Sequence, residues 1–284
     1  MTPLVATYAL NFVYQVEILA LVVLGLGVVF GLLGVMNMAH GEFVMLGAYS
    51  VIVVQRMGLP FLWGLPVTLV VCIVIGWVAE RLIVRPLRDR PIDTLLGTWG
   101  LSLLMRKGVE AVFGKGYQNV NGQLTGTIHL LGTTYPTYRI VLIVAIAVGF
   151  ALLAWWYLRS PAGTRVKAVV GNPVLAQAVG INTQRMATTT FVCGVTVAGL
   201  AGFALAPLVT IEPDMGLNFL LNGFFVLIVG GLGGLVGLGV GSGVIGGAQV
   251  LVASLINQTA GYLTVLIIAI VFIWLKPNGL VPRR

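Results

Sequence analysis

Residues 34–42 read GVMNMAHGE, and this polar stretch interrupts a long apolar part of the chain. Residues 18–41 and 43–55 carry no formal charge, so Glu42 stands alone between two apolar segments, with His40 close by. A charged side chain placed in hydrocarbon costs about 2.5–3.5 kcal/mol on insertion scales. The break therefore decides how the N-terminal part of the chain folds, and it is the first candidate for a functional site.

Two interpretations of this break remain open from the sequence. Gly34 and Gly41 flank the polar group and weaken a helix, which is typical of broken transmembrane helices near a transport path. In that interpretation Asn37, His40 and Glu42 line a translocation pathway. In the other interpretation, the same stretch is a polar turn that joins two separate helices at the membrane surface.

The composition excludes a soluble globular domain. Hydrophobic residues make up 58% of the 284 residues and charged residues 8%, whereas soluble domains carry about 25% charged residues. Residues 215–275 form a run of 61 residues without a charge, which is long enough for about three spans of ~20 residues. The apolar runs are continuous rather than alternating, which argues against a β-barrel. We therefore predict an all-α fold, a polytopic transmembrane helical bundle that forms one domain over residues 1–284.

Basic residues gather in three clusters, and these set the expected topology. The positive-inside rule places such clusters on the cytoplasmic side. Two spans between the first and second clusters, and four between the second and third, return the chain to that side each time. We therefore expect the N-terminus outside and the C-terminus in the cytoplasm. The clusters comprise Arg81, Arg85, Arg88 and Arg90, then Arg159, Arg165, Lys167 and Arg185, and finally Lys276, Arg283 and Arg284.

The helix count depends on how the N-terminal region is divided. Either residues 17–34 and 41–55 are separate helices, or residues 8–21 span first and residues 22–54 form one long broken segment. Both alternatives predict nine helices, whereas a single pass there predicts eight and moves the N-terminus inside. The longest outer loop is expected at residues 115–137.

Glycine-weakened helices occur in both halves of the chain. Residues 30–36 resemble residues 229–235 in the spacing of their glycines. Matching weak points predict an internal repeat with broken helices and a solute path at the junction of the halves, which adds Gly231 and Gly234 to the candidate pathway residues. The alternative is that these glycines serve only close helix packing.

The sequence offers little for catalysis. It contains two histidines, eight Asp and Glu residues, and no phosphate-binding loop of the GxxxxGK[ST] type. Cys72 and Cys193 lie inside apolar runs, which is typical of small core residues rather than of a disulfide or a metal site. We therefore expect no metal, no other cofactor and no enzymatic activity in this chain.

Residues 160–187 form the longest cytoplasmic stretch and carry their own helix signals. Asn172 suits an N-cap, Pro173 the first helical position and Gly180 the C-terminal stop. The short helix between them is apolar and follows a basic stretch. It can be buried beneath the bundle, in the lipid headgroup region, or in a groove of a soluble partner.

With these motifs in order, the chain resembles the permease subunits of the branched-chain amino acid importer family, at the first type of permease subunit. That family includes urea and short-chain amide permeases, and its members are subunits of ATP-binding-cassette importers. Order and spacing of the motifs hold over nearly the whole chain. The resemblance rests on residues 31–42 with 45–49, 80–88, 165–169, 178–183, 230–234 and 276–280.

The resemblance implies an assembly in a bacterial inner membrane. Its parts are a second permease subunit, usually a different chain, two cytoplasmic ATPase subunits, and a soluble substrate-binding protein. ATP hydrolysis belongs to the ATPase subunits. Glu212 and Asp214, in an outer turn, would face the binding protein. The implied ATPase-docking residues are Arg165, Lys167, Asn172, Pro173, Leu175, Val179 and Gly180.

The solute is predicted from one further segment. Residues 93–103 resemble the Thr-Trp-Gly segment of urea and amide permeases. A small neutral amide needs hydrogen-bond partners, which Thr98, Trp99, Ser102 and Asn37 can supply in an otherwise apolar pathway. Trp99 can equally be a packing or interface aromatic. We therefore expect urea or a short-chain amide first and a branched-chain amino acid second.

Two other classes of protein remain as alternatives. A stand-alone channel or ion-coupled carrier more often has ionisable residues deep in several spans, and here the region of Glu42 alone qualifies. An integral-membrane enzyme lacks a plausible catalytic set in this sequence.

Overall fold

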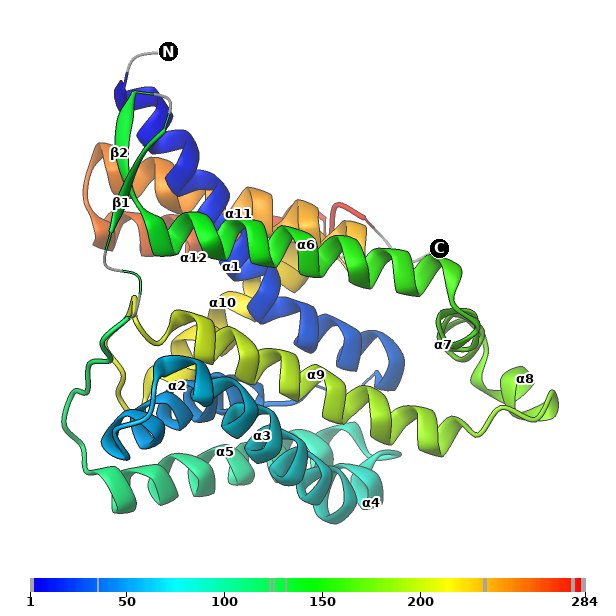
Figure 1. Cartoon of the computed structure of the whole chain (residues 1–284). Helices are drawn as coiled ribbons and strands as arrows, with labels where there is room; N and C mark the ends of the chain where they lie inside the picture. The colour runs from blue at the N-terminus through cyan, green and yellow to red at the C-terminus, as the bar shows by residue number, and fades with distance from the viewer. Residues whose placement is uncertain are drawn as a thin grey trace.

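The computed structural model describes residues 3–34, 36–122, 124, 126–130, 132–231, 234–276 and 279–281, most of them helical (Figure 1). Several residues singled out above lie outside this part: Val35 of the break, Leu232 and Gly233 of the glycine run, Pro277 and Asn278 of the last motif, and Arg283 and Arg284. The longer helices are α1 (Pro3–Leu33), α2 (His40–Arg56), α3 (Gly64–Ala79), α5 (Pro91–Phe113), α6 (Thr137–Arg159), α9 (Thr183–Leu205), α10 (Met215–Gly230), α11 (Leu235–Leu255) and α12 (Gln258–Leu275). The short elements are η1 (Phe61–Trp63), η2 (Glu80–Val84), α4 (Arg85–Leu87), α7 (Pro161–Gly171), α8 (Pro173–Ala178), β1 (Thr127–Leu130) and β2 (Thr133–Pro136).

Six helical segments are long and apolar enough to cross a membrane. They are Val5–Leu32, Phe61–Leu87, Thr137–Arg159, Thr183–Leu205, Val236–Leu255 and Gln258–Leu275. With α2, α5 and α10 added, the described part of the chain holds nine long helices, which agrees with the prediction of eight to nine. The helical bundle predicted from the composition is therefore confirmed.

The N-terminal region resolves one of the alternatives left open by the sequence. α1 is continuous from Pro3 to Leu33, and α2 starts separately at His40. The division into a first span at residues 8–21 and a broken segment at residues 22–54 is therefore wrong. The other division is correct in kind, although α1 begins 14 residues earlier than residue 17 because polar residues there are compatible with a helix.

The basic clusters gather at one end of the bundle. α4, α7 and the C-terminal end of α12 lie together there, whereas the N-terminus and the β1–β2 hairpin lie at the opposite end (Figure 1). This agrees with the even number of spans predicted between the clusters. The expected loop at residues 115–137 is not wholly irregular, because β1 and β2 pair in antiparallel fashion within it.

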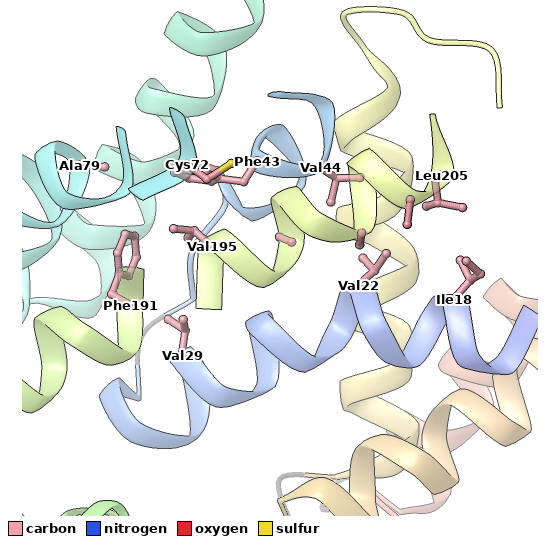
Figure 2. Close-up of a cluster of buried hydrophobic side chains, with 14 of the residues drawn as sticks. Ile18, Val22, Val29, Phe43, Val44, Cys72, Ala79, Phe191, Val195 and Leu205 are labelled. Carbon is pink, nitrogen blue, oxygen red and sulfur yellow. The ribbon is translucent and has the colours of Figure 1, made fainter. Parts of the chain in front are cut away.

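The core lies where α1, α2, α3 and α9 meet. Figure 2 shows Val22 and Val29 of α1 pointing toward α2 and α9, with Phe43 and Val195 filling the space between the helices. Cys72 is fully buried in this cluster, as its apolar surroundings in the sequence predicted. Cys193 is exposed instead, so the expectation of a core position is wrong for that residue.

Glycines bring the backbones of α2 and α9 into direct contact. A Cβ added at Gly47 would collide with the Gly199 carbonyl oxygen, and one at Gly202 would collide with the Val44 carbonyl oxygen. Small residues at such positions allow the close backbone approach that favours helix association in membranes. The contact fixes α2 within the bundle and thereby places the polar residues at its start.

Candidate functional site

The break between α1 and α2 leads the chain back into the bundle. Gly34 ends α1 with a φ of 66°, a left-handed conformation that favours glycine. α2 then begins beside the middle of α1, where His40 Nε2 donates to the Val22 carbonyl oxygen at 3.0 Å. Val22 precedes Leu33 by 11 residues, which is about 16 Å of helix at 1.5 Å per residue. The non-helical segment therefore penetrates the protein rather than staying at the end of α1.

The polar side chains of the break are buried. Asn37, His40 and Glu42 are 1%, 0% and 1% exposed. Asn37 Oδ1 accepts a hydrogen bond from the Ala39 backbone N–H at 3.0 Å, which holds the turn that starts α2. The polar group of the break, between two separate helices, is therefore enclosed by protein.

Helix α5 presents a polar stripe to this break. Thr94, Thr98, Ser102, Arg106 and Glu110 recur every fourth residue, so they share one face of the helix, and we call them the polar stripe. The first three are buried, at 0%, 0% and 3% exposure. The opposite face of α5 is apolar and exposed. This helix is therefore polar toward the bundle and apolar away from it.

Three contacts join the polar stripe to the break. The Met38 backbone N–H donates to Thr98 Oγ1 at 3.1 Å. Ser102 Oγ and Arg106 Nη2 both donate to Glu42 Oε1, at 2.8 and 2.9 Å. The buried carboxylate is thus paired with a guanidinium, which offsets part of the cost of removing both charges from water.

Arg106 also reaches the turn between α9 and α10. Its Nη1 lies 3.2 Å from Asp214 Oδ1, and the side chain of Asp214 is 71% exposed while that of Arg106 is 15% exposed. Arg106 therefore connects a buried carboxylate on one side with an exposed carboxylate on the other. The two ion pairs of Arg106 thus connect the interior of the protein with its surface.

Several polar atoms near the polar stripe have no hydrogen-bond partner among the described residues. These atoms are Asn37 Nδ2, His40 Nδ1, Glu42 Oε2, Tyr49 Oη and Arg106 Nε. A buried polar group without a partner costs about 1–3 kcal/mol, so native proteins normally satisfy it with water or a ligand. Their concentration around one helix pair marks this region as the candidate site.

A small pocket opens beside Asp214. It has a volume of about 120 Å³ and is lined almost entirely by charged side chains. Glu110, the outermost residue of the polar stripe, contacts Lys107 and Lys115 there, at 2.5 and 3.2 Å. The lining residues are Lys107, Glu110, Lys115, Glu212, Pro213 and Asp214.

Some of the predicted pathway residues do not join this site. Trp99 is 54% exposed on the far face of α5, whereas its neighbour Thr98 is buried. Gly231 and Gly234 have positive φ values of 79° and 76° and flank the turn between α10 and α11. That turn lies against the C-terminal segment, where the Leu280 N–H donates to the Val229 carbonyl oxygen at 2.9 Å. Of the predicted pathway residues, Thr98 and Ser102 of the polar stripe contact the break, where Asn37, His40 and Glu42 are buried, whereas Trp99, Gly231 and Gly234 lie elsewhere.

The predicted docking helix forms as expected and stands out from the bundle. Asn172 Oδ1 accepts from the Val174 and Leu175 backbone N–H groups, Pro173 starts α8, and Gly180 follows it with a φ of 87°. The exposed fractions of Leu175 and Val179 are 65% and 72%. The apolar face of α8 is therefore not buried by the described part of its own chain.

The preceding residues form a second helix that the sequence analysis missed. α7 carries Arg165 and Lys167, and Ser160 caps it by accepting a hydrogen bond from the Gly163 N–H at 2.9 Å. The signal was present in the sequence, since Ser160 followed by Pro161 is a typical helix start. The segment predicted to dock the ATPase therefore forms a pair of short helices, α7 and α8, at the basic end of the bundle (Figure 1).

The helical fold, with six segments long and apolar enough to cross a membrane, is that of a multi-pass membrane protein. Among the described residues, no group of three or more His, Cys, Asp or Glu side chains could hold a metal ion. The identity of the family follows from comparisons with known proteins.

The family model described as the branched-chain amino acid transport system, permease component, matches residues 8–275, and the chain belongs to this family. The high-affinity branched-chain amino acid transport system permease protein LivH of Salmonella typhimurium is 25% identical over 282 residues, covering 93% of this chain and 91% of LivH. LivH of Escherichia coli K12 is 26% identical with the same coverage. The resemblance inferred from the sequence motifs is confirmed, and the chain is a permease subunit of an ATP-binding-cassette importer, a transport subunit.

A solved structure supports the fold. PsaBC from Streptococcus pneumoniae in complex with Fab matches with a TM-score of 0.53, covering 95% of this chain and 92% of that chain. The sequence identity is 11%, so this similarity concerns the fold alone.

Proposed function

We propose that this subunit forms the translocation pathway for a small polar solute along the contact between α2 and the polar stripe of α5. The observation that carries the proposal is the buried ion pair of Glu42 and Arg106, whose oxygens and nitrogens are incompletely satisfied. Polar and ionisable groups inside a membrane protein are costly and typically mark substrate or ion pathways. The non-helical segment before His40 supports this reading, because irregular backbone at such depth is tolerated where it is buried in protein or lines a cavity.

The solute we favour is an amino acid with an apolar side chain. The LivH relatives are permeases of branched-chain amino acid transport systems, and the region offers charged groups of both signs, which suit a zwitterion. The expected preference for urea or an amide drew on Trp99, whose side chain is exposed on the far face of α5. Thr98 and Ser102 keep urea or a short amide as the second candidate, because both hydroxyl groups lie on the polar stripe.

The proposed assembly contains a second permease, two ATPase subunits and a binding protein in a bacterial inner membrane. The basic end of the bundle would face the cytoplasm by the positive-inside rule, which puts the N-terminus outside and the C-terminus inside. Glu212 and Asp214, at the opposite end, would then face the binding protein. In this orientation the exposed apolar face of α8 is presented to the ATPase.

The function is tested by reconstituting the complex in vesicles with its binding protein. We expect uptake of leucine that requires ATP and is competed by valine or isoleucine but not by urea. Full uptake by this polypeptide alone, independent of nucleotide, would favour a channel or carrier. Competition by urea in place of valine and isoleucine would favour the second candidate solute.

The docking assignment is tested by replacing Leu175 and Val179 together with Asp. We expect loss of ATPase subunits from the purified complex without unfolding of the bundle, since both side chains are exposed and contribute little to the core. Met57→Asp is the control, because Met57 is 69% exposed in the turn that follows the C-terminal end of α2. Normal recovery of the ATPase with the double variant would refute the assignment.

A further inference from the structure

We infer that Arg106 is a specificity-determining residue that receives the carboxylate of the solute by exchanging it for Asp214. The inference rests on the proposed function, and it concerns which groups of this chain recognise the solute. Its basis is the two-sided environment of one guanidinium, which has a buried partner and an exposed partner.

The buried side of Arg106 is fixed. Nη2 donates to Glu42 Oε1 at 2.9 Å, and Glu42 is itself anchored by Ser102 at 2.8 Å. The side chain of Glu42 is only 2% exposed, so separating this pair would leave an uncompensated buried charge. Arg106 therefore stays oriented with its Nη1 edge directed outward.

The outer side of Arg106 is exchangeable. Asp214 contacts Nη1 through one oxygen at 3.2 Å, and its side chain is 71% exposed. Only Asp214 is exposed in this pair, and it regains water when it turns away, so this separation costs less than breaking the buried pair with Glu42. A solute carboxylate could use the same edge of the guanidinium, with a geometry that favours two parallel hydrogen bonds.

The charged pocket gives a route to this edge. Asp214 belongs both to the pocket lining and to the pair with Arg106, so the pocket and the guanidinium meet at that residue. The pocket lining carries the ammonium groups of Lys107 and Lys115 and the carboxylates of Glu110, Glu212 and Asp214, so it offers charges of both signs to a zwitterion. A zwitterionic solute leaving a binding protein at this end would encounter charged groups of both signs before it reached Arg106.

The exchange keeps the charges balanced for a zwitterion. Before exchange, Arg106 is paired with both Glu42 and Asp214. After exchange, the solute carboxylate occupies the Nη1 edge, and the released Asp214 carboxylate pairs with the solute ammonium. Urea or a neutral amide cannot replace Asp214 in this way, because it carries no negative charge. Arg106 would therefore separate amino acids from amides.

The test measures the rise in thermal unfolding temperature that each solute produces in the purified permease–ATPase complex without the binding protein. The solutes are leucine, 4-methylpentanoate, which has only the carboxylate, and leucinamide, which has only the ammonium. For the wild type we expect the largest rise with leucine, a smaller rise with 4-methylpentanoate and none with leucinamide. An equal rise with leucinamide, or none with leucine, would overturn the inference.

Two variants separate recognition from folding. Arg106→Gln should lose the responses to leucine and 4-methylpentanoate, with Arg139→Gln as the control at the same end of the bundle. Asp214→Asn keeps the Glu42–Arg106 pair and removes the competing carboxylate, so its response to 4-methylpentanoate should increase and match or exceed that to leucine. An unchanged order of responses in Asp214→Asn would overturn the inference even if Arg106→Gln fails to fold.

These outcomes are distinct from failure of the proposed function. The wild-type complex can take up leucine with ATP while Arg106→Gln changes the thermal responses to leucine and to leucinamide equally. That result would overturn only the role of Arg106. Absence of ATP-driven uptake of leucine by the complete wild-type complex would instead count against the proposed solute.

Discussion

Two helices contact α2 by opposite means. α9 meets it through glycines, with backbone against backbone at Gly47 and Gly199. α5 meets it through the polar stripe, with hydroxyl groups and a guanidinium directed at the Glu42 carboxylate and the Met38 N–H. The first contact is close-packed and has no polar side chain to rearrange. The second depends on a few charges whose partners can be exchanged.

The difference extends to how each helix sits in the bundle. α9 contacts α1, α2 and α3, and most of its C-terminal half is buried. The main neighbours of α5 within the described residues are α2, α4 and η2, and α5 lies at the edge of the bundle (Figure 1). Packed interfaces resist small displacement, whereas a helix held by few contacts moves at lower cost. We therefore expect α5 to be displaced at lower cost than α2 and α9.

The largest effect should come from breaking the charged contact. Glu42→Ala removes the buried carboxylate and leaves Arg106 without its inner partner. Breaking one side of a buried ion pair costs about 3–5 kcal/mol, so we expect strongly reduced thermal stability and loss of transport. Thermal unfolding of the purified protein and uptake by the complex both measure this effect.

Asp93→Asn is the control for Glu42→Ala. Asp93 pairs with Arg90 at 3.7 Å on the surface, with side-chain exposures of 47% and 77%. An exposed pair contributes about 0–1 kcal/mol, so this variant should resemble the wild type. If Glu42→Ala were equally harmless, the break would not carry a buried charge and the surface-turn interpretation would return.

An intermediate effect is expected at the glycine contact. Gly202→Ala places a methyl group against the Val44 carbonyl oxygen, where backbone rather than a flexible side chain must shift. Overpacking of this kind costs about 1–3 kcal/mol. We expect a lower thermal unfolding temperature and a uniform loss of transport for every solute, measured on the same complex.

Gly149→Ala on α6 is the matched control. A Cβ there would meet open space, so the change should be neutral or slightly stabilising because alanine favours helix. Equal destabilisation by both substitutions would show that helix propensity or insertion, and not the α2–α9 contact, determines the response.

The sequence predicted the scaffold better than the contacts across it. Continuous apolar runs and three basic clusters were enough for the helix count and for the common end of the clusters. Asn172, Pro173 and Gly180 predicted α8 because capping is local chemistry, readable within a few residues. The break at residues 34–42 was visible for the same reason, since a polar group in an apolar run stands out.

The pairing of Glu42 with Arg106 could not be predicted, because 64 residues separate them and no local rule joins α2 to α5. The four-residue spacing of the polar stripe was visible, and it would have separated Thr98 from Trp99. Successive residues on a helix differ by about 100°, so neighbours in sequence face different ways. Trp99 was grouped with Thr98 and Ser102 because the three are close in sequence, although Thr98 and Ser102 share a buried face of α5 and Trp99 lies on the exposed face.

The smallest effect tests the stripe alone. Ser102→Ala removes the hydroxyl group that donates to Glu42 Oε1 at 2.8 Å and leaves the Arg106 contact to the same oxygen in place. A single hydrogen bond to a charged group contributes about 1.5–3 kcal/mol when its partner is left unsatisfied, and less here because Arg106 remains, so we expect a loss of about 1 kcal/mol. Thermal unfolding measures this loss, and Ser254→Ala is the control because its hydroxyl donates to the Leu251 carbonyl oxygen within its own helix.

If α5 is the mobile element, Ser102→Ala should also raise basal ATPase activity of the complex without solute, because the contact that restrains α5 is weaker. A stability loss with unchanged basal ATPase activity would mean that α5 is displaced no more easily than α9 and remove the distinction between the two contacts.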